Sequence, residues 1–189
     1  MKIILASASP RRKELLGQLV EDFQIIPADI NEDRRDKEGP ETYVQRLSLE
    51  KAEAIAIKHP DSLVLGADTT VAFGDRVLNK PKDKDRAREF LQLLSGQTHR
   101  VCSAYTLICQ TQDISITRIS ITEVKFIDIP EPDLESYLDS DEPYDKAGAY
   151  AIQGEAAEFV QSINGSYNSV VGLDTEMLAG DLQACFQKI

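Results

Sequence analysis

Short apolar runs bounded by polar or turn-forming residues recur along the first half of the chain. Runs of this length and composition are typical of buried strands, and they lie at residues 2–7, 23–27 and 62–73. Gly74-Asp75 follows the third run and has the composition of a two-residue hairpin turn. The polar segment 28–39 shows no apolar period, so we expect it to be a loop.

Between these runs, apolar residues recur at helical spacing. Helices are expected over residues 41–58 and 83–94, and Gly96 lies just past the end of the second. A shorter helix should begin at Ser9-Pro10, because Ser is a favoured helix cap and Pro a favoured first helical residue.

Residues 99–126 change to β character, and the polar residues 110–113 divide them into two strands. Apolar positions in the second strand do not simply alternate, since the pattern shifts phase after Ile116 and again after Ile121. Such shifts indicate β-bulges or a strand that crosses between two layers.

The rest of the chain mixes both types of element. Helices are expected over residues 133–139 and 174–187, separated by the apolar segment AGAYAIQG at 147–154, which is interpreted as a strand. Asn164-Gly165 lies between two stretches with β character and is a strong hairpin signal.

Composition narrows the class of protein. The chain has 189 residues, 42% of them hydrophobic, and a formal net charge of −11. We therefore expect one α/β domain over residues 1–189, with a mixed sheet and flanking helices. Such an acidic protein is a poor binder of nucleic acid or anionic membrane, and no apolar run is long enough to span a bilayer. A cytoplasmic location follows as the expectation, and the three cysteines are expected to be buried thiols.

Basic residues concentrate in the first turn of the first helix, against the trend of the chain. Arg11, Arg12 and Lys13 follow the small residues 6–9. Backbone N–H groups at a helix N-terminus favour anions, and arginine side chains match phosphate oxygens. The alternative is a capped helix whose arginines pair with surface acids, and on these residues alone both readings stay open.

An apolar run places Asp68 near the carboxyl end of a strand, where open α/β sheets bind ligands. A carboxylate there can hold a metal or activate a water, although an isolated Asp more often caps a turn. Lys80 precedes Pro81, which restricts its backbone, and its charge could bind a phosphate. The side-chain amide of Gln153 could form hydrogen bonds with the edge of a nucleotide base or with a neighbouring backbone group.

Together these residues resemble the Maf family of nucleotide pyrophosphatases. The resemblance covers nearly the whole chain, in family order, and is carried by SASPRR at 7–12, Glu32, EKA at 50–52, GADT at 66–69, KP at 80–81, KAGAYAIQG at 146–154 and NGSYNSVVGL at 164–173. It implies an elongated, two-lobed α/β molecule with a central cleft, related in fold to the inosine-triphosphate pyrophosphatases. Many relatives have Gly where this chain has Asn79, a departure that removes no charged group.

The resemblance also implies an activity, which is cleavage of a nucleoside triphosphate to monophosphate and pyrophosphate with Mg²⁺ or Mn²⁺. The GAYAIQG motif is similar to that of the subgroup acting on dTTP and UTP. Asp68 matches the catalytic base, and Glu32 and Asp68 match acids at the metal. Phosphate-contacting positions are matched by Ser7, Arg11, Arg12, Lys51 and Lys80. Positions tied to substrate choice are matched by Arg11, Thr69 and Gln153. A homodimer is expected from the resemblance alone.

Two other function classes compete with this hypothesis. One is a nucleotide-binding regulator of cell division without turnover, which has no need of a carboxylate such as Asp68 beside the scissile phosphate. The other is a nucleic-acid binder that uses the basic turn, which the net charge of −11 disfavours.

Overall fold

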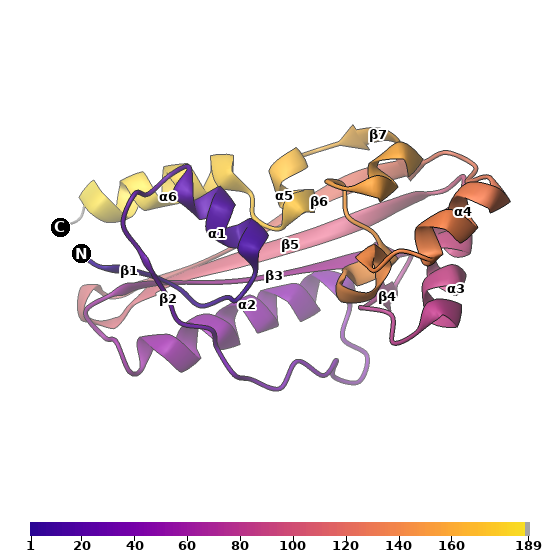
Figure 1. Cartoon of the computed structure of the whole chain (residues 1–189). Coiled ribbons are helices and arrows are strands. Elements are labelled where there is room, and N and C mark those ends of the chain that lie inside the picture. Colours follow the sequence, from indigo (N-terminus) through magenta and orange to yellow (C-terminus); the bar gives the residue numbers. More distant parts are fainter. Residues whose placement is uncertain (188–189) are drawn as a thin grey trace.

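A seven-stranded mixed sheet forms the centre of the computed structural model, which describes residues 1–187 (Figure 1). The strand order is β2-β1-β3-β5-β6-β7, and β4 pairs with β3 as a hairpin. Their bounds are β1 Ile3–Leu5, β2 Gln24–Ile25, β3 Leu63–Phe73, β4 Arg76–Leu78, β5 Thr98–Cys109, β6 Ile114–Phe126 and β7 Val160–Asn164. Strand β1 is parallel to β2 and β3, and all other pairs are antiparallel.

Helices cover both faces of this sheet. They are α1 Pro10–Gly17, α2 Pro40–Ala56, α3 Lys84–Leu94, α4 Glu131–Leu138, α5 Tyr167–Val171 and α6 Thr175–Gln187. Helix α2 lies along one face, and α1 and α6 lie on the other (Figure 1). In β1, Ile3 and Leu5 face α1 and α6, whereas Ile4 packs under α2, which explains why this strand is apolar throughout.

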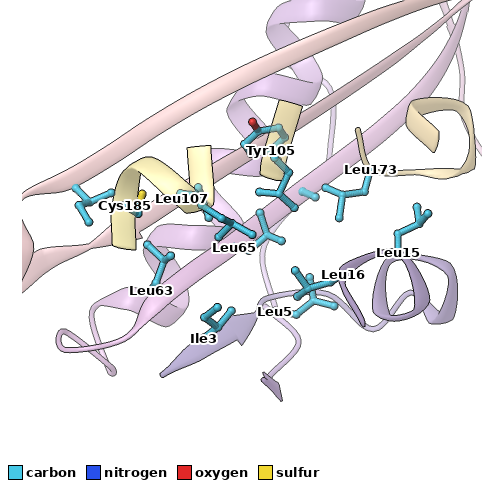
Figure 2. Packing of buried hydrophobic residues seen from close by; sticks show 14 of the residues in the cluster. Ile3, Leu5, Leu15, Leu16, Leu63, Leu65, Tyr105, Leu107, Leu173 and Cys185 are labelled. Carbon is cyan, nitrogen blue, oxygen red and sulfur yellow. The ribbon is translucent and has the colours of Figure 1, made fainter. Parts of the chain in front are cut away.

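Two apolar cores lie at opposite ends of the long strands. The first gathers Ile3, Leu5, Leu16, Leu65 and Leu107 under α1 and α6 (Figure 2). The second contains aromatic and leucine side chains from α3, α4, β6 and the segment after α4, including Phe90, Leu94, Phe126, Tyr137, Tyr150 and Phe159. Strands β3, β5 and β6 have 11, 12 and 13 residues and pass from one core to the other, which makes the molecule elongated (Figure 1). The expected fold class is confirmed.

Gly66 of β3 lets α2 lie against the sheet. A Cβ at this position would meet the carbonyl of Ser48 and come within 2.6 Å of the Ala52 nitrogen. Successive side chains of a strand alternate faces, so Asp68, two residues further on, also points toward α2. The missing side chain therefore brings Asp68 close to the residues that α2 presents.

Of the two explanations for the phase shifts in the second long strand, β-bulges after Ile116 and Ile121 are wrong. Strand β6 pairs with β5 in unbroken register from Ile114 to Lys125, and a register shift lies at Lys125/Phe126, against β7. The apolar pattern changes phase because different faces are covered along the strand. Ile114 joins the first core, whereas Ile119 points to the other face and packs beneath α2.

Two further expectations near the C-terminus are corrected. Residues 147–154 are not a strand, because the chain makes a 3₁₀ turn at Ala147–Ala149 with Gly148 at φ +68°. A Cβ on Gly148 would come within 2.9 Å of the Val71 side chain, so this turn packs directly on β3. Asn164-Gly165 does not form a hairpin either, because Ser166 accepts a hydrogen bond from Ser169 N and caps α5.

The remaining predicted elements are confirmed, with ends that differ by a few residues. The hairpin at Gly74-Asp75 joins β3 to β4, and Ser9 caps α1 by accepting from Arg12 N. All three cysteines are buried. In residues 1–187, no helix is long and apolar enough to cross a membrane.

Candidate active site

A cavity of about 680 Å³ lies where β1 ends beside β3. Strand β1 pairs with β3 only as far as Leu65, and β4 pairs with it only from Val71, so neither strand covers the residues between. The N-terminus of α1, the segment 28–39 and the turn at 145–153 surround this gap. Every site residue expected from the sequence lines the cavity: Ser7, Arg11, Arg12, Glu32, Lys51, Asp68, Thr69, Lys80 and Gln153.

Lys51 joins two carboxylates at the cavity wall. Its Nζ lies 2.7 Å from Asp68 Oδ1 and 2.8 Å from Glu32 Oε1. The side chains of Lys51 and Asp68 are 9% and 11% exposed, whereas that of Glu32 is 55% exposed. Burial raises the pKa of the Asp68 carboxyl above its usual range, although the charges of Lys51 and Arg12 act in the opposite direction.

Arg12 cross-links three segments on the other face of β3. Its Nε donates to Gly172 O at 3.0 Å, and its two terminal nitrogens donate to Ser7 Oγ and Thr69 Oγ1, both at 3.2 Å. Thr69 Oγ1 is also hydrogen-bonded to Ser103 Oγ at 2.9 Å. The guanidinium therefore fixes the two hydroxyl groups relative to each other.

Other polar groups of the cavity remain free to meet a ligand. The side chains of Arg11, Lys80 and Gln153 form no hydrogen bond or ion pair with other residues of the described chain 1–187. Ser9 N donates to Ser7 Oγ and Arg12 N donates to Ser9 Oγ, so the turn before α1 is tight and the two serine hydroxyls bind backbone N–H groups at the start of the helix. Cationic side chains thus line the same cavity as the two carboxylates.

Comparison with known proteins places this arrangement in a family. The family model described as Maf-like protein matches residues 2–185. The chain belongs to the Maf family. It is 49% identical over 172 residues to a "dTTP/UTP pyrophosphatase" of Syntrophus aciditrophicus, covering 91% of this chain and 84% of that protein. It is 44% identical over 182 residues to a protein of the same name from Bacillus cereus, covering 96% and 94%.

The fold of this Maf-family chain is also found in more distant structures. The Ham1 protein of Staphylococcus aureus matches with a TM-score of 0.58 at 12% identity, covering 97% of this chain and 99% of that one. A HAM1 protein from Coxiella burnetii matches with a TM-score of 0.53 at 15% identity over the same shares. At such identities the likeness concerns the fold alone.

The carboxylates fit a divalent cation only in part. Glu32 and Asp68 both reach the single ammonium group of Lys51, so their oxygens converge on one point. Within residues 1–187 no cluster of three or more His, Cys, Asp or Glu side chains is arranged to hold a metal. Two carboxylates suit Mg²⁺, which commonly takes its remaining ligands from substrate phosphates and water.

Several residues of the cavity were not singled out from the sequence. Tyr43 lies two helical turns before Lys51 on α2, and this spacing could have placed it on the same face. Lys146 lies within the motif at 146–154, and its Nζ is held by Glu142 O and Asp145 Oδ1. Tyr150 is buried against His99, with 2.7 Å between its hydroxyl and His99 Nε2, a contact between distant segments that no local pattern signals.

Proposed function

We propose that this Maf-family chain is a nucleoside triphosphate pyrophosphatase that hydrolyses dTTP and UTP to the monophosphate and pyrophosphate. The observation that carries the proposal is the buried Lys51–Asp68 pair, with Glu32 beside it, in a cavity that also holds unpaired cations. The names of the similar proteins from Syntrophus and Bacillus support the same substrates.

The triphosphate is held by groups from separate elements. Arg11 and Lys80 supply positive charge from side chains that form no hydrogen bond or ion pair within the described residues, and Ser7 and Arg12 complete the phosphate site. Lys51 faces the same cavity from α2. Neutralising and positioning the phosphates accounts for most of the catalysis in phosphoryl transfer.

Asp68 acts as the general base. Its Oδ1 is bound to Lys51, and within the described chain nothing donates to its other oxygen, which is left for the attacking water. The water oxygen bonds to the α-phosphorus while the bond from that phosphorus to the bridging oxygen breaks. Asp68 takes the water proton, and pyrophosphate leaves with the bridging oxygen. Burial raises the pKa of Asp68, and a higher pKa makes the carboxylate a better base.

Glu32 and Asp68 would hold a divalent cation, Mg²⁺ or Mn²⁺, together with phosphate oxygens of the nucleotide. When bound, such a cation neutralises charge on the phosphates. The carboxylate of Glu32 supports this assignment, because it is 55% exposed and can turn from Lys51 toward a ligand in the cavity.

Substrate choice is assigned to Arg11, Thr69 and Gln153. Thymine and uracil present O2, N3–H and O4, and a side-chain amide such as Gln153 has both a donor and an acceptor to meet them. Thr69 is held rigidly by Arg12 and Ser103, and a fixed hydroxyl discriminates better than a mobile one.

The wider properties of the protein belong to the same proposal. We expect one domain over residues 1–189, a cytoplasmic location and a homodimer, with no nucleic-acid partner. The net charge of −11 supports the last point, and analytical ultracentrifugation would test the oligomeric state.

Product analysis tests the central proposal. The protein is incubated with dTTP and Mg²⁺, and the products are separated by anion exchange. Monophosphate and pyrophosphate are expected, and activity should disappear with EDTA. Release of orthophosphate and a diphosphate would contradict attack at the α-phosphate, and EDTA-resistant turnover would contradict the metal assignment.

A further inference from the structure

The segment that carries Glu32 has no regular secondary structure of its own. Residues 26–39 contain neither helix nor strand, and the chain runs alongside α2 before it enters that helix (Figure 1). Glu32 itself reaches the site only through its contact with Lys51, and its side chain is 55% exposed. Something other than backbone pairing must therefore hold this segment in place.

One face of α2 supplies the missing contacts. Tyr43 Oη donates to the carbonyl of Glu32 at 2.8 Å, and Arg46 Nη2 donates to the carbonyl of Asp33 at 3.0 Å. Two consecutive backbone carbonyls are thus fixed by side chains three residues apart on α2, a spacing that places both on one helix face. The guanidinium carbon of Arg46 also lies 5.6 Å from the centroid of the Tyr43 ring.

Arg46 is itself locked by Glu38 at the end of the same segment. Its Nε and Nη2 donate to the two oxygens of Glu38 at 2.6 and 2.9 Å, and the side chains are 10% and 5% exposed. This forked pair is the geometry that arginine forms with carboxylates and that lysine cannot reproduce. The hydrogen bond from Arg46 lowers the pKa of Glu38 to about 2, so the carboxylate stays charged at any working pH.

Further contacts tie the segment to this pair. Glu38 Oε2 accepts from Arg35 N at 3.0 Å, and Glu38 O accepts from Arg34 Nε at 2.6 Å. Glu50 of α2 binds Arg46 and Arg35 together, at 3.0 and 2.7 Å. Residues 32–38 are thereby wrapped around one arginine.

We propose that Arg46 is a positioning residue that, with Tyr43, holds the backbone of Glu32 so that its carboxylate stays beside Asp68. The inference rests on the proposed function, because it takes Glu32 to be a ligand of the divalent cation. Arg46 does not line the cavity, so its effect on the reaction passes through the position of Glu32.

The test compares Arg46→Lys, which keeps the charge but loses the fork, with the full-length wild-type protein. Mn²⁺ is titrated by electron paramagnetic resonance in the presence of α,β-methylene-dTTP, which cannot be cleaved at the α-phosphate. Residues that orient metal ligands typically change metal affinity about 10- to 100-fold, and we expect Mn²⁺ binding to weaken by that order. Hydrogen exchange of residues 31–38 should accelerate, while kcat should recover at high Mg²⁺ concentration.

Tyr43→Phe provides a second variant with little effect on folding, since it removes only the hydroxyl that holds the Glu32 carbonyl. It should weaken Mn²⁺ binding in the same direction. Arg88→Lys on α3 is the matched control, because Arg88 pairs with Glu131 and Glu135 on the surface and is absent from the cavity wall. Its Mn²⁺ affinity should equal that of the wild type.

The outcomes separate this inference from the proposed function. Unchanged Mn²⁺ affinity in Arg46→Lys and Tyr43→Phe, in a protein that still hydrolyses dTTP, would overturn the positioning role alone. A wild-type protein that binds no Mn²⁺ even with the nucleotide analogue would overturn the metal assignment of Glu32, and with it the positioning role. Weaker Mn²⁺ binding combined with faster exchange of residues 31–38 would support both.

Discussion

One ammonium group holds the two carboxylates of the proposed catalytic centre. Lys51 is nearly buried and lies within 2.8 Å of both Asp68 and Glu32. Two carboxylates this close repel each other when both are ionised, and the lysine compensates part of that repulsion. Lys51 therefore helps to keep both carboxylates ionised, so that Asp68 can accept a proton and Glu32 can bind a cation. This role adds to any contact that Lys51 makes with phosphate.

Asp68→Asn tests the role of the base. The amide keeps the shape of the side chain but cannot take the proton from water, so kcat for dTTP should fall by roughly 10²–10⁴-fold or more. Nucleotide binding, measured by calorimetry, should persist. Asp61→Asn, at an exposed position outside the cavity, is the control and should keep full activity. Near-normal turnover in Asp68→Asn would return the non-catalytic regulator to consideration.

Gln153→Ala tests substrate choice. The side chain lines the cavity without a hydrogen bond to other described residues, so its amide is available to a base. An unpaired polar group in a base site costs about 1–3 kcal/mol, so kcat/KM for dTTP and UTP should fall roughly 5- to 150-fold and approach that for CTP. Gln110→Ala, in the turn between β5 and β6, is the matched control. A wild-type protein that hydrolyses GTP as well as dTTP would contradict the pyrimidine assignment.

At the scale of elements, the site depends on how closely α2 approaches β3. Gly66 lies under Ser48 and Ala52, and Lys51 comes from the same stretch of helix. A fixed helix-to-strand distance sets the reach of Lys51 to Asp68. This explains why a glycine stands inside a buried strand, where it weakens the strand itself.

Gly66→Ala tests this approach. The added Cβ would come within 2.6 Å of the Ala52 nitrogen, a backbone atom that cannot move without the whole helix. Overpacking of this kind typically costs about 1–3 kcal/mol, which lowers the melting temperature by roughly 2–4 °C per kcal/mol at this chain length. Gly180→Ala in α6, where the Cβ would meet nothing within 4 Å, should instead raise stability by about 0.5–1 kcal/mol. Equal melting temperatures for both variants would refute the close-packing argument.

The elements also show what the sequence can and cannot predict. Strands β1 and β3 and helices α2 and α3 follow from the local pattern of apolar residues, because their apolar residues are buried. The apolar pattern of β6 predicts bulges or a strand that crosses between two layers, and the local sequence does not distinguish them. The structure has no bulge at these positions against β5, and the strand is covered by the first core at Ile114 and by α2 at Ile119. The turn at Gly148 was misread as strand, because its conformation is set by packing on Val71, a contact distant in sequence.

The structure brings together all nine residues that the resemblance implies for the site, since they line one cavity, and their roles stay predictions. The contacts of Arg46 with Glu38 and Asp33 could not be foreseen in the same way. They depend on the path of a segment without secondary structure, which only the folded chain defines.

At the scale of the whole molecule, three long strands join the two apolar cores at their ends. The cavity is lined by residues from both halves of the molecule, each half being the part around one core. Arg11 lies on α1, which covers the first core, and the segment before Gln153 contacts both cores, through Tyr150 of the second and Ile152 of the first. Because β3, β5 and β6 are continuous between the cores, we expect the two halves to unfold together, as the proposed single domain requires.

His99 of the second core provides the last test, through pH. Its ring is 2% exposed and packs edge-on against Phe126 and Tyr150, and Nδ1 has no partner among the described residues. Burial lowers the pKa of His99 from 6.5 to about 4. In the unfolded chain His99 therefore becomes protonated below pH 6.5, whereas in the folded chain it becomes protonated only near pH 4. The contribution of His99 to the free energy of unfolding should be fully present above pH 6.5. It should decline by up to about 1.4 kcal/mol per pH unit as the pH falls toward 4.

The comparison with His99→Gln isolates this contribution from the carboxylates that titrate in the same range. The amide can still reach the Tyr150 hydroxyl but takes up no proton, so urea unfolding of the variant should lack this part of the pH dependence. Hydrogen exchange then locates the effect. If the cores unfold as one unit, protection should fall equally at Leu65 in the first core and at Phe126 in the second between pH 6.5 and 4.5 in the wild type, because both amides then exchange through the same global opening. Loss of protection confined to the second core would contradict the single domain, since the long strands would then transmit no stability between the halves.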